Sequence, residues 1–427
     1  MAVVLAAASL AGASCDREED DIWDQSAAQR LEQAQKEDLA TLCSAPNGWQ
    51  MLYFCNGQEQ GYNFLMKFDE HGGVTIATRN PNTGNAYTEE ASMYDVLVDD
   101  GPVLSFSTYN SLFHRYADPD PEHTQASDGI GSGGDYEFNI MTISDEMIYL
   151  HGKKTKVDIY MYPLEEGKNW EEYFNDLYTL RDNLFHASIP TLWLTLADGS
   201  RYSITDAASQ VMNFVPEGGD AITQTVTVPY VMTEAGIRLM SAFPNDSVEV
   251  DHVQEFTLDE SGRFLVGDDA TEDGAVATMT APAPSEVFQA ISTVWVCDSE
   301  AFTGTLATAY EELISDFEST FKGYHVYSVG FRFANNHYSF SLKFGPTLAS
   351  SREAYFYYEL KEEGDNVSFA FSGECDNNGT AASRCAEVGE FINELGALTY
   401  ELQTESDLNP KRITFANNNG GFSVDLQ

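Results

Sequence analysis

Hydrophobic and polar residues alternate along most of this chain, and Gly, Asn and Asp separate the alternating stretches. A period of two is typical of strands that bury one face, and such turn residues join antiparallel strands. The first third of the chain contains eight such stretches: 49–54, 62–68, 74–78, 94–98, 103–108, 136–143, 148–151 and 157–162. Eight successive strands predict a meander that closes on itself, because closure leaves no exposed edge.

Two amphipathic helices frame this first meander. Ser26 opens one of them and forms a capping box with Gln29. The other spans 170–184, where apolar residues recur every three or four positions. We therefore expect a first domain at 26–187 that combines helices with a β-meander.

The rest of the chain divides into two further blocks. Residues 188–281 form a β-rich middle segment that ends in an acidic, Ala/Pro-rich linker, and 282–427 form a second domain of helices and β-meander. The strands expected in the middle segment are 192–196, 201–204, 225–231, 237–240, 254–258 and 264–266. Those expected in the last block are 324–333, 338–344, 354–360, 367–371, 399–403, 412–415 and 422–426.

The last block resembles the first in sequence. GGDYEF (133–138) matches GALTYEL (396–402), and VLSFST (103–108) matches VSFAFS (367–372), both at an offset of about 264 residues. This steady offset suggests a duplication, although two unrelated meanders can give similar short matches. The expected fold is mainly β: two antiparallel meander domains, each a lipocalin-like barrel or a sandwich, with a few amphipathic helices and a β-rich middle segment.

The N-terminus has the pattern of a bacterial lipoprotein signal. Residues 1–14 are small and apolar, Cys15 follows, and acids then dominate an expected tether at 15–25. About 14 apolar residues are too few to cross a bilayer as a helix but suit the core of a signal peptide. We expect Cys15 to carry the lipid. No Lys or Arg precedes Cys15, which departs from the usual signal, and a cytosolic protein with an apolar N-terminus is the alternative.

The charge of the chain limits its partners. Acidic residues number 68 against 22 basic ones, giving a net charge of −46. Such a chain repels the phosphate backbone, so nucleic acid is not an expected partner. Clustered carboxylates permit Ca²⁺ or another divalent ion, although a solvated acidic surface explains most of these charges. No other cofactor is expected.

The cysteines suggest disulfides but no metal or redox motif. Cys375 and Cys385 bracket a loop rich in Asn and Gly and form the first candidate pair, with Cys43 and Cys55 as a weaker one. Cys297 is then left over and is expected to be buried. The spacing contains no CxxC.

The loop at 114–134 is the leading candidate for a site, because long loops between strands are often functional. Its potential metal ligands are His114, Asp118, Asp120, Glu122 and His123. Their spacing matches no known metal motif, and a solvated loop that caps the barrel is the favoured interpretation. Acidic loops at 267–275 and 375–379 are weaker candidates. No GxSxG is present, and no catalytic residue is assigned. Exposed aromatic residues that stack on sugars are a separate hypothesis.

Several stretches resemble a lipoprotein family of gut Bacteroidetes catalogued as domain of unknown function 4302. The resemblance lies in 44–54, 62–78, 101–119, 133–141, 150–154, 226–240 and 255–264. It implies a surface lipoprotein, often encoded beside outer-membrane transporters that import nutrients. It implies no reaction, because none is established for the family.

The leading hypothesis is therefore a non-enzymatic surface lipoprotein, anchored in the outer membrane and facing the exterior. It would bind a carbohydrate or peptide ligand, or a transporter complex, as part of a nutrient-uptake system. One alternative is an adhesin that adds strands at a free edge, which unpaired edges at 422–426 or 192–196 would favour. The other is a metal-assisted hydrolase that uses the 114–134 loop.

Overall fold

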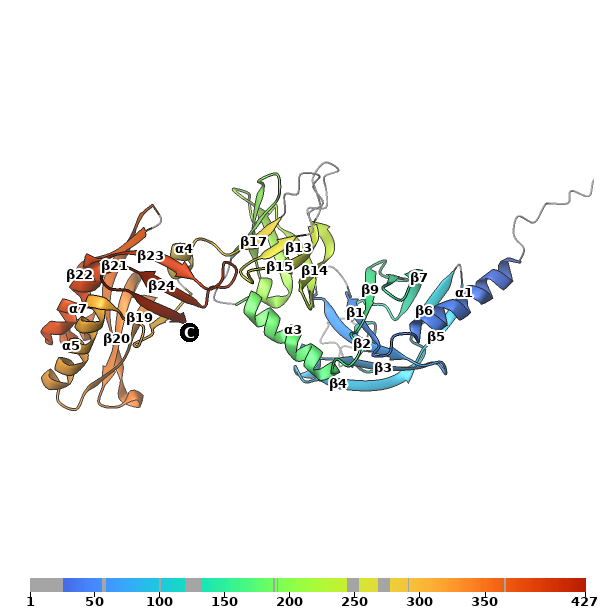
Figure 1. Ribbon diagram of the computed structural model, residues 1–427, viewed down its shortest axis with the longest axis horizontal. Helices are drawn as coiled ribbons and strands as arrows, with labels where there is room; N and C mark the ends of the chain where they lie inside the picture. Colours follow the sequence, from blue (N-terminus) through green and yellow to red (C-terminus); the bar gives the residue numbers. More distant parts are fainter. Residues whose placement is uncertain are drawn as a thin grey trace, which may run out of the picture.

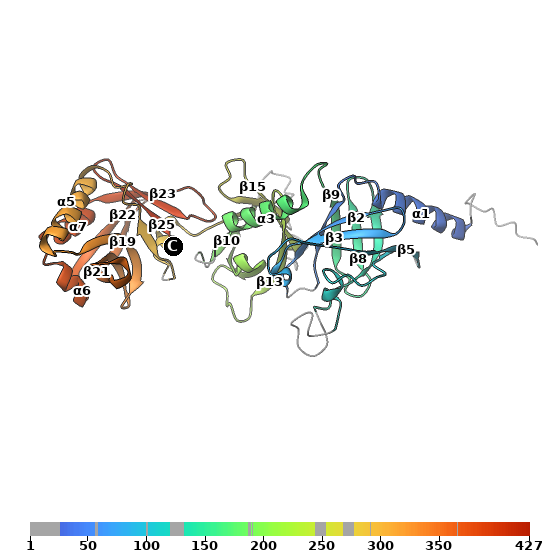
Figure 2. The same cartoon turned by 90° about the horizontal axis from the view of Figure 1, so that it is seen from below.

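The computed structural model describes residues 26–427 apart from 56–58, 100, 120–131, 187–188, 190, 244–252, 268–276, 291 and 365. The described chain is mostly β, with 42% strand and 22% helix, and its sheets are antiparallel, which confirms the expected fold class. Three sheets follow one another along the long axis of the molecule, in sequence order (Figure 1). Figure 2 shows the same order from below.

The first sheet is a half-barrel, called the first barrel below, that curls until its two end strands are consecutive in the chain. Its order is β4-β3-β2-β1-β9-β8-β7-β6-β5, and only Tyr94 separates β4 from β5. One bent segment thus pairs with β3 through its first half and with β6 through its second. The strands are β1 (Trp49–Tyr53), β2 (Tyr62–Phe68), β3 (Gly73–Thr78), β4 (Thr88–Met93), β5 (Asp95–Val98), β6 (Pro102–Ser105), β7 (Glu137–Ile143), β8 (Ile148–Gly152) and β9 (Asp158–Pro163).

Helix α1 (Ala27–Leu42) covers the open edge of β5. The predicted capping box is present: the Gln29 amide donates to the Ser26 side chain and the Ser26 amide donates to that of Gln29. The Gln35 side chain donates to the backbone carbonyl of Val96 in β5. This contact occupies an edge acceptor that another strand would otherwise pair with.

The middle segment is itself a closed barrel, which the sequence did not predict. Its order is β10-β11-β12-β13-β14-β15-β16-β17, and β10 pairs with β17 to close the ring. The two strands absent from the prediction are β12 and β17, and the three-residue β17 lies inside the expected linker. The strands are β10 (Leu192–Thr195), β11 (Arg201–Thr205), β12 (Val211–Pro216), β13 (Val226–Thr233), β14 (Gly236–Phe243), β15 (Val253–Leu258), β16 (Leu265–Gly267) and β17 (Thr278–Thr280).

The third sheet is also a closed barrel, of eight strands in sequence order, in which β18 pairs with β25. Its strands are β18 (Trp295–Cys297), β19 (His325–Ala334), β20 (His337–Gly345), β21 (Arg352–Glu363), β22 (Asn366–Cys375), β23 (Thr399–Thr404), β24 (Arg412–Ala416) and β25 (Phe422–Leu426). The remaining helices are α3 (Trp170–Leu184), α4 (Pro284–Phe288), α5 (Gly304–Thr320), α6 (Asn377–Ala382) and α7 (Ala386–Ala397).

The first and third sheets share one strand plan. If β4 and β5 count as one bent strand, β6 and β22 are both fifth in their rings, and β7 and β23 are both sixth. These are the elements at or beside which the sequence matches of the two blocks fall. In each ring the first strand pairs with the second and with the last. The shared plan supports the proposed duplication.

A buried tryptophan begins both rings and ties each to the helix before it. The Trp49 indole N–H donates to the carbonyl of Leu42, the last residue of α1, at 2.8 Å. The Trp295 indole N–H donates to the carbonyl of Phe288, the last residue of α4, at 3.1 Å. Both side chains are at most 1% exposed. Each bond satisfies a carbonyl at a helix end that has no partner within its helix.

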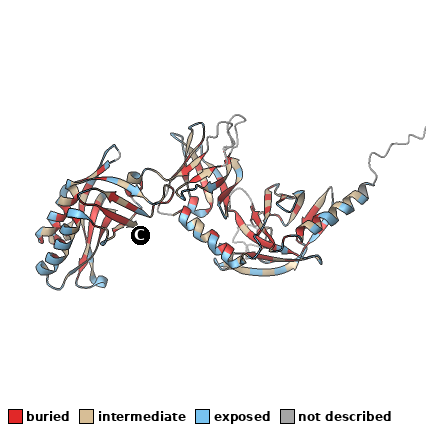
Figure 3. Ribbon diagram, in the orientation of Figure 1, coloured by how far each residue is buried: buried red, intermediate tan, exposed pale blue. Residues whose placement is uncertain are grey.

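The barrels have filled interiors rather than a hollow ligand chamber. Buried residues lie along the strands of all three sheets (Figure 3). In the third barrel, Phe331, Phe369, Phe415 and Phe422 form a stack in which the rings of Phe415 and Phe422 lie 4.5 Å apart and almost parallel. Such a core leaves the outer surfaces and loops to bind other molecules.

The first two barrels are joined by main-chain and side-chain bonds. The amide of Gly61, just before β2, donates to the Tyr230 carbonyl in β13 at 3.1 Å, and the Asn63 side chain donates to the Met232 carbonyl at 2.9 Å. The Arg238 side chain is buried against the Tyr160 ring of the first barrel, 4.0 Å from its centre, and pairs with Glu255. These contacts make the two barrels one packed unit.

The third barrel docks on the end of α3. The Asn409 side chain donates to the Asn183 carbonyl at 3.0 Å, and the Lys411 ammonium donates to the Asp182 carbonyl at 2.8 Å. A cation at the carboxyl end of a helix is favourable because of the helix dipole. Beside it, Arg263 of the middle barrel makes a bidentate pair with Asp407 of the third barrel.

The structure does not form the expected disulfides: the four cysteines of the two candidate pairs are free thiols. Helix α6 separates Cys375 from Cys385. The Cys385 thiol is buried and donates to Glu387, and burial, with a smaller contribution from that bond, raises its pKa to about 11. Cys43 lies 3.5 Å from the Tyr94 hydroxyl, whereas Cys55 is buried in the first core. Cys297 is buried, as expected.

We predict that the two buried tryptophan bonds stabilise their barrels. Replacing Trp295 by Phe leaves the Phe288 carbonyl without its buried donor and should lower the free energy of unfolding by about 1–3 kcal/mol. Trp49→Phe should act likewise on the first barrel. Urea denaturation followed by fluorescence measures both. Trp170→Phe is the control, since its acceptor Asn47 is only partly buried; equal losses in all three variants would contradict the prediction.

We predict that the third barrel protects the end of α3 from solvent. In Asn409→Ala the last carbonyls of α3 lose a buried donor, so amide hydrogen exchange at 181–186 should accelerate. Asn335→Ala, which removes a bond to Tyr357 within the third barrel, is the control and should leave that exchange unchanged. Unchanged exchange in Asn409→Ala would show that the helix end does not depend on the third barrel.

Candidate functional site

An open groove of about 630 Å³ lies at one end of the first barrel, where the chain leaves β6 and later enters β7. Its volume falls within the range of roughly 300–1,000 Å³ that is common for ligand sites. The groove includes the start of the loop that the sequence singled out. Its lining residues are Ser105, Phe106, Ser107, Tyr109, His114, Ala117, Asp118, Pro119, Tyr136 and Glu137.

A fully buried asparagine shapes the wall of the groove. The Asn110 side-chain oxygen accepts from the amides of Leu112 and Phe113, and its NH₂ group donates to the Glu90 carbonyl in β4. The two bonds to the oxygen hold the turn at 111–113, which leads into the short 3₁₀ helix at His114–Tyr116. On the opposite wall, the Phe106 amide donates to the Tyr136 carbonyl at 3.1 Å. The groove is thus built on a fixed backbone.

His114 is held as a neutral ring. Its Nδ1 accepts from the Asn110 amide at 3.0 Å, and its Nε2 lies 2.9 Å from the Phe106 carbonyl, to which it must donate. Burial lowers the pKa of His114, and this outweighs the opposing effect of its two backbone bonds. Because both nitrogens are already bonded, the ring contributes its aromatic surface rather than a free base or ligand atom.

Tyr109, His114 and Tyr136 form a row of three rings. The Tyr109 and His114 centroids are 5.5 Å apart, and those of His114 and Tyr136 are 5.2 Å apart, with the planes tilted by 33° and 31°. The two tyrosine side chains are 52% and 44% exposed. Exposed aromatic rings held in fixed positions offer apolar contact surface to a ligand.

Two carboxylates border the row of rings. Asp118 accepts from the Tyr109 hydroxyl at 3.4 Å, and burial together with the charge of Asp118 raises the pKa of Tyr109. Glu137 accepts from the Ser105 hydroxyl at 3.2 Å and lies 3.8 Å from the Lys153 ammonium. The groove therefore combines aromatic faces with hydrogen-bonding oxygen atoms, a composition that suits polar, uncharged molecules.

The predicted metal site is only partly within the described chain. Asp120, Glu122 and His123 lie outside it, and His114 has no free nitrogen to bind a metal. No three His, Cys, Asp or Glu side chains converge among the residues that the structure describes.

The two weaker acidic loops do not strengthen the metal hypothesis. In the 375–379 loop, Asp376 caps α6 through the Gly379 amide. The other loop, at 267–275, lies outside the described residues apart from its first residue.

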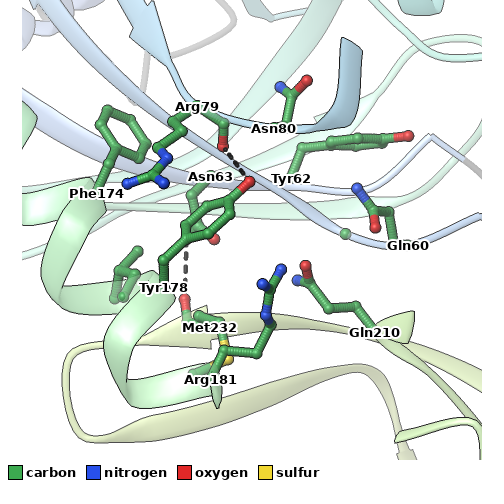
Figure 4. Close-up of a pocket in the computed structure, with 12 residues that line it drawn as sticks. Gln60, Tyr62, Asn63, Arg79, Asn80, Phe174, Tyr178, Arg181, Gln210 and Met232 are labelled. Atoms are coloured by element: carbon green, nitrogen blue, oxygen red, sulfur yellow. Dashed lines mark hydrogen bonds between the residues drawn. The ribbon is translucent and has the colours of Figure 1, made fainter. Parts of the chain in front are cut away.

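A second pocket lies between the first two barrels (Figure 4). The Arg79 and Arg181 guanidinium groups lie 4.1 and 4.5 Å from the centre of the Tyr178 ring, whose hydroxyl donates to the Arg79 carbonyl. The two arginines are also bound to Asn85 and Asp182. A volume of about 20 Å³ holds about one water molecule. This pocket is part of the barrel interface rather than a ligand site.

A family model described as "Domain of unknown function (DUF4302)" matches residues 19–260. This is more than half of the chain. The protein belongs to the DUF4302 family. The match includes every lining residue of the groove and ends within the ring of the middle barrel, between β15 and β16, so the third barrel lies beyond it.

Other comparisons add no functional information for this DUF4302 protein. No curated protein matched it. The beta subunit from the DNA polymerase of Streptococcus pyogenes matched at 10% identity over 93% of this chain and 96% of that one, with a TM-score of 0.12. MucB in complex with MucA(peri) matched at 10% identity over 92% of each chain, also at 0.12. TM-scores this low do not indicate a shared fold.

The sequence predicted the loop but not its aromatic surface. The sequence signal for this surface was the position of Tyr109 and Tyr136 on either side of the long loop. Tyr136, however, was assigned to a strand. Strand β7 begins one residue later, at Glu137, so Tyr136 lies just before the strand and is exposed.

We predict that His114 makes the DUF4302 protein less stable in mild acid. Since its folded pKa lies below the unfolded value of about 6.5, the unfolded chain binds more protons as pH falls. The stability contributed by His114 is complete above that value and is lost below it. NMR titration should give a midpoint below the ordinary one. Urea denaturation between about pH 7.5 and about pH 5.5 should show a smaller pH dependence in His114→Gln than in the wild type.

Proposed function

We propose that this protein is a non-enzymatic surface lipoprotein that binds a ligand at the groove of its first barrel, as a component of a nutrient-uptake system. The observation that carries the proposal is the exposed row of Tyr109, His114 and Tyr136 in a groove of ligand size. The barrel interiors are filled with side chains, which supports binding on the outside.

The chemistry of the groove supports binding rather than catalysis. A general base needs a free nitrogen or carboxylate oxygen within reach of its substrate. Both nitrogens of His114 are bonded to the backbone, so the ring supplies no free base. The Asp118 and Glu137 carboxylates accept from neighbouring hydroxyls, and their further acceptor sites suit hydrogen bonding to a ligand.

The proposed location rests on the sequence before α1. Small apolar residues precede Cys15, an acidic stretch follows it, and α1 then begins at Ala27. None of the helices in the described part of the chain combines the length and the apolar character needed to cross a bilayer. The proposed partner, an outer-membrane transporter complex, rests on the resemblance of the chain to surface lipoproteins.

The adhesin alternative lacks the edges that would favour it. Both strands named for strand addition are paired on both sides: β25 with β18 and β24, and β10 with β11 and β17. In the first sheet, α1 lies over β5, and the Met93 carbonyl at the end of β4 accepts from the Ser107 amide. Paired or covered edges disfavour the addition of another strand.

We predict that the chain is lipidated at Cys15. Metabolic labelling with palmitate should mark the wild type, and fractionation should place it in the outer membrane. Cys15→Ala should lose both the label and the membrane fraction, since one acyl anchor contributes about 0.8 kcal/mol per buried CH₂. Cys43→Ala is the matched control and should keep both. An unlabelled wild type recovered among the cell's interior proteins would overturn the proposal.

A further inference from the structure

We infer that the groove binds a neutral carbohydrate chain, with sugar rings stacked on Tyr109 and Tyr136. This inference rests on the proposed function, because it names the ligand class of the same groove. The first step is the fit of a sugar to the aromatic row. A pyranose has an apolar face of C–H groups and an equator of hydroxyls, so it stacks on an aromatic ring and forms hydrogen bonds at its rim.

The length of the row favours a ligand of more than one ring. The centroids of Tyr109, His114 and Tyr136 are separated by steps of 5.5 and 5.2 Å, and the outer two rings are the exposed ones. A single sugar covers one such ring. A ligand that uses both tyrosines must therefore extend along the groove, as an oligosaccharide does.

The rim of the groove supplies acceptors for sugar hydroxyls. Asp118 and Glu137 lie among the lining residues, together with Ser107. Carboxylate oxygens accept from more than one donor, so a bond to Tyr109 or Ser105 leaves room for a ligand hydroxyl. Hydroxyl donors meeting carboxylates make the stronger, charge-assisted type of hydrogen bond.

The charges of the groove argue against an anionic ligand. Two carboxylates line it, His114 is neutral, and the whole chain carries a net charge of −46. Uronic-acid polymers and phosphorylated ligands would be repelled.

A cationic ligand is also disfavoured. Glu137 already lies near the Lys153 ammonium, which offsets its negative charge. The aromatic rings stand in a row rather than around one centre, as a cage for an ammonium group would require.

The test measures binding of defined neutral oligosaccharides to the full chain. Calorimetry and affinity electrophoresis would use gluco-, manno- and xylo-oligosaccharides, with polygalacturonate and oligolysine as the anionic and cationic probes. At least one neutral series should bind, and the charged probes should not. Tyr109→Ala and Tyr136→Ala should each weaken binding about tenfold, the loss expected when one stacked ring is removed.

Matched variants separate stacking from folding. Tyr109→Phe keeps the ring but loses the bond to Asp118, so it should retain most of the affinity. Met141→Ala removes an exposed apolar side chain of the same barrel outside the groove and should change nothing. If an alanine variant fails to fold by circular dichroism, saturation-transfer NMR on the wild type decides instead, by showing whether sugar protons contact tyrosine rings.

The outcomes distinguish this inference from the proposed function. Preferred binding of oligolysine or polygalacturonate, or neutral binding that persists in the double variant Tyr109→Ala/Tyr136→Ala, would overturn the carbohydrate assignment. Binding of no neutral series by a protein that is palmitoylated and located in the outer membrane would also overturn it, while leaving the surface lipoprotein proposal in place. Loss of the palmitate label alone would overturn only the latter.

Discussion

The pairing of the first strand with the last is the constraint on which this structure depends. A strand at the edge of a sheet leaves a row of unpaired amides and carbonyls, and an aromatic-rich chain with such edges would associate with other chains. The middle and third sheets satisfy those groups by closing on themselves. The first sheet places a bent segment at its opening and covers β5 with α1. Closure also creates the enclosed space that the phenylalanines and tyrosines fill.

Because side chains fill the barrel interiors, residues that could contact a ligand lie on the outer surface. In a barrel with a hollow centre, the inward residues would recognise a ligand. Here Phe331, Phe369 and Phe415 pack against one another in that space. The groove of the first barrel instead uses residues where the chain leaves one strand and enters another. A rigid ring holds the ends of that loop, so the positions of Tyr109 and Tyr136 are set by the barrel without blocking their exposed faces.

Much of the fold could be predicted from the sequence, because period-two patterning is a local property. Of the strands that were missed, β12 (VMNFVP) has apolar residues and was overlooked, whereas in the others this signal is weak. Strand β4 (TEEASM) has hardly any apolar residue, and β17 and β18 are three residues long and are defined by their partners. The middle barrel escaped prediction because two of its strands were missed, β12 and the closing strand β17.

The sequence pointed to the loop beside the groove but not to the chemistry of the side chains that line the groove. The first residues of the loop after His114 line the groove, yet the expected ligand atoms of His114 are bonded to the Asn110 amide and the Phe106 carbonyl. Only tertiary structure decides which atoms of a side chain remain available. The abundant carboxylates illustrate the same limit: Asp69, Asp259 and Asp376 accept backbone amides within tight turns. Part of the acidic character thus belongs to the turns of the meanders.

Ring closure also has a consequence for how the molecule can be divided. The family match stops at residue 260, after β15, whereas the middle barrel needs β16 and β17 to join β15 to β10. A truncation at that boundary would remove β16 and β17 from the barrel. The edges of β10 and β15 would then be unpaired and could add strands from other molecules. A fragment that keeps the middle barrel closed must therefore extend through Thr280, the last residue of β17.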